Sequence, residues 1–77
     1  MSKSALSLLT ELARLDIDTK TAVAIWALTE NSPNAVEMTT EILRTMKTAT
    51  KHQALAAMTK AIVLYPTPEM NRLRIGE

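Results

Sequence analysis

The sequence has no cysteine and no phenylalanine, and its 77 residues include one glycine, one tryptophan and one tyrosine. Without cysteine, disulfides and thiolate metal sites are excluded, and the composition suits a reducing compartment, so we expect a cytoplasmic protein. Because there is also only one histidine, we expect no metal ion and no cofactor. The scarcity of glycine and aromatic residues argues against a β-sandwich or barrel.

Long apolar runs are absent as well. The longest covers residues 61–65, far short of the roughly 20 residues that a membrane-spanning helix needs. The N-terminus also lacks an apolar segment followed by a cleavage site. We therefore expect neither a membrane segment nor secretion.

Residue types that carry catalysis are few and scattered. His52 stands beside Lys51, with no cysteine to act as a nucleophile and no nearby carboxylate to orient its ring. The only glycine, Gly76, lies at the end of the chain, so no glycine-rich phosphate loop exists. We expect no catalytic residues and no enzymatic activity.

The residues that are abundant, namely alanine, leucine, methionine and threonine, favour helices in a single domain spanning residues 1–77. A chain of this length buries only about 60% of its unfolded surface, so a homodimer is expected to add stability. Apolar residues recur at three- and four-residue steps through residues 4–15, which predicts a first helix with Ser4 as its N-cap. Asp18 is the expected N-cap of a second helix, apolar on most sides and therefore the most buried, that runs to residue 31.

Two further helices are expected in the second half. Asn34, followed three residues later by Glu37, resembles a capping box at the start of a third helix. Residues 47–50 have no large apolar side chain and are expected to form a turn. Thr50 and Gln53 then predict a second capping box, opening a fourth helix that runs to residue 64.

The C-terminal segment follows a different pattern. Pro66 and Pro68 exclude a helix there, and residues 71–75 alternate, with Arg72 and Arg74 on one side, as in a half-buried strand. Pairing with residues 62–65 would make a short β-hairpin. The predicted fold is therefore mostly α, with three to four helices, a helix-turn-helix and a short C-terminal β-hairpin.

Charge is divided unevenly along the chain. Residues 1–43 carry three lysines and arginines against six carboxylates, whereas residues 44–77 carry six against two. A basic half of this kind is typical of a surface that binds a polyanion, although small proteins also divide charge unevenly by chance.

The order of helix, helix, helix-turn-helix and terminal hairpin resembles the winged helix-turn-helix domain of small bacterial and phage transcription regulators with a MarR-like layout. The resemblance covers residues 6–75 as a layout without a diagnostic motif. It implies a sequence-specific DNA-binding regulator, a homodimeric repressor in the cytoplasm, with helix 51–64 in the major groove and residues 65–75 as the wing. Two features differ: the segment between the paired helices is longer, and no glycine follows the last helix.

The resemblance also implies which residues face double-stranded DNA. Gln53 would read a base, because its amide can pair bidentately with adenine. Arg72 and Arg74 would belong to the wing. The remaining expected contacts lie in the turn and on the outward face of the fourth helix: Lys47, Thr48, Thr50, Lys51, Ala57 and Lys60.

An alternative is a small helical protein-interaction module, such as a phage- or plasmid-type inhibitor or adaptor that binds a host protein. The length of the chain and its leucine- and methionine-rich helices favour this function. It predicts helix to about residue 64 and an exposed apolar patch, whereas a packed terminal hairpin would favour DNA binding.

Overall fold

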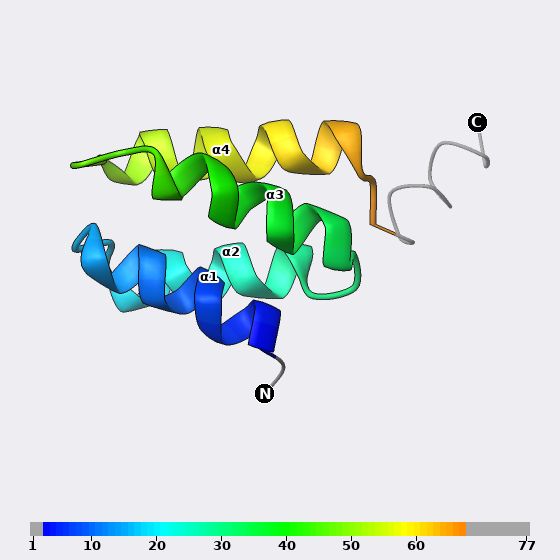
Figure 1. Ribbon diagram of the computed structural model, residues 1–77, viewed down its shortest axis with the longest axis horizontal. Helices are drawn as coiled ribbons and strands as arrows, with labels where there is room; N and C mark the ends of the chain where they lie inside the picture. Colours follow the sequence, from blue (N-terminus) through cyan, green and yellow to red (C-terminus); the bar gives the residue numbers. More distant parts are fainter. Residues whose placement is uncertain (1–2, 68–77) are drawn as a thin grey trace.

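The computed structural model describes residues 3–67, and these residues form four antiparallel helices (Figure 1). They are α1 (Lys3–Arg14), α2 (Thr19–Thr29), α3 (Pro33–Arg44) and α4 (Lys51–Leu64). Successive helices run in opposite directions, so α2 and α4 end where α1 and α3 begin. Within residues 3–67, no helix is both long and apolar enough to cross a membrane.

The central helix is α3, which packs extensively against both α1 and α4. The prediction that the second helix would be the most buried is therefore wrong. Val23 and Leu28 of α2 are each more than half exposed, although Ile25 between them is fully buried. Apolar residues surround α2 on most sides, and only one of those sides meets the rest of the protein.

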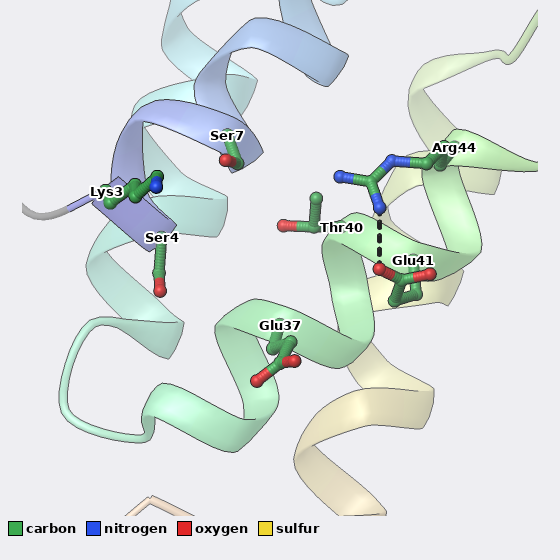
Figure 2. A pocket seen from close by; sticks show the side chains of 7 residues that line it. All are labelled: Lys3, Ser4, Ser7, Glu37, Thr40, Glu41 and Arg44. Atoms are coloured by element: carbon green, nitrogen blue, oxygen red, sulfur yellow. Dashed lines mark hydrogen bonds and ion pairs between the residues drawn. The ribbon is translucent and has the colours of Figure 1, made fainter.

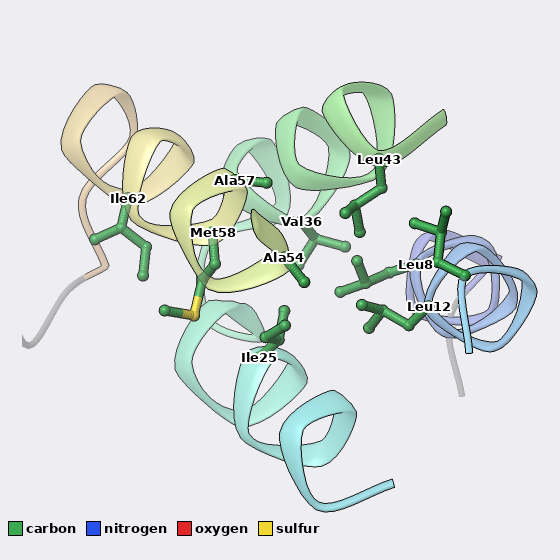
Figure 3. Close-up of a cluster of buried hydrophobic side chains, with 10 residues drawn as sticks. Leu8, Leu12, Ile25, Val36, Leu43, Ala54, Ala57, Met58 and Ile62 are labelled. Atoms are coloured by element: carbon green, nitrogen blue, oxygen red, sulfur yellow. The ribbon is translucent and has the colours of Figure 1, made fainter. Parts of the chain in front are cut away.

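The core lies between all four helices. In Figure 3, Leu8 and Leu12 of α1 face Val36 and Leu43 of α3, while Met58 of α4 points toward α2. Its buried members are Leu8, Leu12, Leu15, Ile25, Val36, Leu43, Ala54, Ala57, Met58 and Ile62. The small alanine side chains of α4 allow that helix to approach α3 closely.

Local hydrogen bonds explain where the helices begin and end. The Asp18 carboxylate accepts from the backbone N–H of Thr21 at 3.0 Å, which confirms Asp18 as the N-cap of α2. The end of α1 is a Schellman motif, in which the N–H of Ile17 bonds to the carbonyl of Leu12 at 3.0 Å. The residue between the two helices, Asp16, adopts a positive φ of 58°.

Two of the predicted N-caps are wrong. Ser4 lies inside α1, which already includes Lys3. The N-cap of α3 is Ser32, with Pro33 at the first helical position, so Asn34 lies within the first turn. Proline there stabilises a helix start because the amide it lacks would have had no partner within the helix.

The turn and the fourth helix agree with the predictions. Residues 45–50 are not helical, and α4 runs from Lys51 to Leu64. The capping box is complete: the Thr50 hydroxyl accepts from the N–H of Gln53 at 3.1 Å, and the Gln53 carbonyl oxygen accepts from the N–H of Thr50 at 2.8 Å.

The predicted β-hairpin is wrong. Residues 62–64 form the last turn of α4, and residues 3–67 contain no strand. Ile62 is buried in register with Met58, one turn earlier, so packing against the bundle outweighs the β-propensity of this apolar run. Residues 71–75, with Arg72 and Arg74, lie outside the described residues. The predicted winged-helix fold is thereby corrected to a bundle of four helices.

Candidate interaction surfaces

The turn between α3 and α4 presents four of the residues predicted to face DNA. Lys47, Thr48, Thr50 and Lys51 are all exposed there. Thr50 already serves as the N-cap of α4. The structure therefore brings these residues together at one end of the bundle, the end at which α2 and α4 begin (Figure 1).

Gln53, the predicted base reader, is exposed on the first turn of α4. Its side-chain carbonyl oxygen is held by the N–H of Thr50 in the capping box. Bidentate pairing with adenine needs both the oxygen and the nitrogen of the amide. Reading a base in this way would therefore require the capping box to open.

Ala57 and Lys60 were both expected on the outward face of the fourth helix. Lys60 is exposed, but only 3% of Ala57 is accessible, so the predicted outward position of Ala57 is wrong. Because α4 packs against both α2 and α3, Ala57 is buried on the same side of the helix as Ala54, Met58 and Ala61. Figure 3 shows the Ala57 side chain on the α3 side of α4.

One cation of the basic second half, Arg44, forms ion pairs with carboxylates of the acidic first half. Arg44 Nη1 lies 2.7 Å from Glu41 Oε1, and its Nε lies 4.0 Å from Glu11 on α1. Glu11 also pairs with Arg14 at 2.8 Å. The exposed lysines of the second half, Lys47, Lys51 and Lys60, form no ion pair among residues 3–67.

At the start of α2, hydrogen bonds and a nearby positive charge favour the charged form of the Asp18 carboxylate. The Thr21 hydroxyl donates a hydrogen bond of 2.7 Å to its carboxylate. That bond, the one from the backbone N–H of Thr21 and the positive charge of Lys51 all lower the pKa of Asp18. The hydrogen bonds from Thr21 contribute most to this lowering, and Lys51, the first residue of α4, contributes least.

Several exposed apolar side chains lie at the opposite end of the bundle, where α1 begins and α2 and α4 end (Figure 1). We call this end the apolar end; its exposed apolar residues are Leu6, Leu28, Val63, Leu64 and Tyr65. Val63 is 69% exposed, and Leu28 and Leu64 are each 53% exposed. The interaction module predicted an exposed apolar patch, but none of its residues could be named from the sequence, because residues 62–65 were also considered as a hairpin strand. On the wheel of the helix that runs to residue 64, Val63 lies opposite the buried Ala54 and Ala61.

A groove lies beside the apolar end. It is lined by Asn34, Glu37, Met38 and Glu41 of α3 and by Tyr65, which follows α4. We call it the α3–Tyr65 groove. The Ser32 hydroxyl donates to the carbonyl of Tyr65 at 3.1 Å and thereby ties the end of α4 to the start of α3.

A second hollow lies between α1 and α3 (Figure 2). Lys3, Ser4 and Ser7 come from α1, and Glu37, Thr40, Glu41 and Arg44 come from α3. Polar side chains thus line most of this hollow, and Glu37 and Glu41 stand on the ridge between it and the α3–Tyr65 groove.

Side chains that could take part in catalysis or metal binding are few within residues 3–67. His52 is exposed on the first turn of α4. No group of three or more histidine, aspartate or glutamate side chains within residues 3–67 is placed to hold a metal ion. Comparisons with protein-family models, with curated proteins and with solved structures found no match to the chain.

Proposed function

We propose that this protein is a small helical interaction module that binds a partner protein through its apolar end. The observation that carries the proposal is the exposure of Leu28, Val63 and Leu64, each more than half accessible, in the last turns of α2 and α4 at one end of a bundle whose other end carries exposed lysines. Exposed apolar surface is typical of a protein contact site.

The course of α4 also supports this function. Residues 62–64, which a terminal hairpin would need as a strand, are instead the last turn of α4. Val63 and Leu64 consequently stand on a helix that is rigidly packed along its other side, where Ala61 and Ile62 are buried. Apolar side chains on a rigid element lose little conformational entropy when a partner covers them.

Substitution of the apolar end tests the proposal. Full burial of a leucine contributes about 1.5–3 kcal/mol, and about 1.4 kcal/mol corresponds to a tenfold change in affinity. For a partner captured with the full chain, identified and then purified, we expect Leu64→Lys to weaken binding at least tenfold in a calorimetric titration. Ala56→Lys is the matched control, because Ala56 is an exposed residue of the same helix two turns earlier.

Three outcomes would contradict the proposal. The first is a purified partner that binds Leu64→Lys and wild type equally. The second is equal loss of binding in Ala56→Lys, which would attribute the effect to the added charge. The third is a dimer, detected by light scattering, that dissociates in Leu64→Lys, since it would assign the apolar end to a second copy of the chain.

DNA binding is a second candidate, favoured by the exposed lysines at the turn and on α4. Lys47, Lys51 and Lys60 form no ion pair within residues 3–67. Phosphate contacts from lysine provide affinity without sequence reading, which suits a helix whose Gln53 is engaged in a capping box. The salt dependence of binding to duplex DNA tests this candidate.

A further inference from the structure

The α3–Tyr65 groove adjoins the apolar end and shares Tyr65 with it. Its α3 wall is one stripe of the helix, because Asn34, Glu37, Met38 and Glu41 recur at three- and four-residue steps. Met38 is half-buried and Tyr65 is 42% exposed, so the groove combines apolar surface with a carboxylate-bearing wall.

The two carboxylates of the wall, those of Glu37 and Glu41, carry the same charge and lie one helical turn apart. Glu37 and Glu41 occupy positions i and i+4, an arrangement in which like charges repel across one turn of the helix. Arg44 pairs with Glu41 at 2.7 Å, whereas Glu37 has no ion pair within residues 3–67. A cation brought to this wall would offset the repulsion between the two carboxylates.

The groove is also held in place before any partner binds. The hydrogen bond from Ser32 to the carbonyl of Tyr65 fixes the end of α4 against the start of α3. Thr39 and Leu43, on the opposite face of α3, are buried. A wall fixed by such packing needs little reordering when it is occupied, which favours binding.

We infer that the α3–Tyr65 groove binds a segment of the partner protein that carries lysine or arginine beside an apolar side chain. The apolar side chain lies against Met38 and Tyr65, and the cation lies against Glu37 and Glu41. The inference rests on the proposed function, because it specifies the chemistry of the partner that covers the neighbouring apolar end.

Two synthetic helical peptides of equal length provide the test. Both carry the same leucines at helical spacing; one has lysine and the other has glutamate at every remaining charged position. In fluorescence anisotropy with the full chain, we expect the lysine peptide to bind at least tenfold more tightly than the glutamate peptide. Glu37→Lys should reduce this preference at least fivefold, and amide shifts on binding should map to residues 34–41 and 65.

Glu30→Lys is the matched control, since Glu30 is an exposed carboxylate at the C-cap of α2 and does not line the groove. An equal loss of preference in Glu30→Lys would attribute it to net charge and overturn the inference. Equal binding of both peptides would overturn it too. Neither result affects the proposed function, which depends on Leu64: a partner that needs Leu64 but is insensitive to Glu37→Lys refutes only the groove.

Discussion

Asp18 shows how a single side chain links helix capping to the pH dependence of stability. Its carboxylate accepts hydrogen bonds from both the hydroxyl and the N–H of Thr21. Both bonds favour the charged form and, with the positive charge of Lys51, lower its pKa from the ordinary 3.8. Because the folded pKa lies below the unfolded value, the stabilisation is fully present well above pH 3.8 and is lost as the pH falls through the folded pKa.

We therefore expect Asp18→Asn to lower the melting temperature at about pH 6 and to lower it much less at about pH 2. Thermal unfolding followed by circular dichroism at both pH values measures the difference. The control is Glu30→Gln, because the Glu30 side chain has no hydrogen bond or ion pair among residues 3–67. A pH-dependent loss of the same size in Glu30→Gln would contradict the role given to Asp18.

At the scale of the element, α4 depends on its neighbours and on its cap more than on an amphipathic pattern. Apolar and small residues occur around most of the helix, and its exposed side changes from polar at Gln53 to apolar at Val63. The capping box at Thr50 and Gln53 defines the first turn, since it satisfies two amide groups that the helix leaves without partners.

Removal of that cap should destabilise the whole bundle, because α4 packs against both α2 and α3. We expect Thr50→Ala to reduce the free energy of unfolding by about 1 kcal/mol. In a domain of this size that loss lowers the melting temperature by roughly 4–8 °C. Thr48→Ala is the control, because Thr48 is an exposed threonine of the same turn that makes no hydrogen bond within residues 3–67. If Thr48→Ala were as destabilising as Thr50→Ala, the lost stability could not be assigned to the capping box.

At the scale of the whole molecule, the antiparallel order of the helices separates two kinds of surface. Lys47 and Lys51 lie at one end of the bundle, and the apolar end lies at the other (Figure 1). Lys60 lies nine residues after Lys51, about 13–14 Å further along α4 and within one turn of Val63. Protein binding at the apolar end and DNA binding through Lys47 and Lys51 would thus use different ends of the molecule.

This separation makes the DNA-binding candidate testable on its own. We expect duplex binding, where present at low salt, to weaken as salt rises, with Lys51→Ala and Lys60→Ala each reducing the slope of log K against log salt by about 0.9. Lys3→Ala, on α1, should leave the slope unchanged. If duplex DNA fails to bind at low ionic strength, or if all three variants behave alike, this candidate is excluded.

Short-range sequence signals were sufficient for most of the secondary structure. Asp18, Pro33 and the pair Thr50 and Gln53 mark helix boundaries through contacts within four residues, so the second helix, the turn and the fourth helix could be recognised without knowledge of the fold. The exposed lysines at the turn were recognisable for the same reason.

The exposed surfaces could not be predicted from short-range sequence signals, because they depend on which faces of each helix the neighbouring helices cover. Ala57 is buried since α3 lies against it, and Val23 and Leu28 are exposed since nothing within residues 3–67 covers those two sides of α2. Residues 62–64 have β-propensity, yet the burial of Ile62 below Met58 keeps them helical. The number and placement of the helices followed from local chemistry, whereas the apolar end and the α3–Tyr65 groove arose only when the four helices packed together.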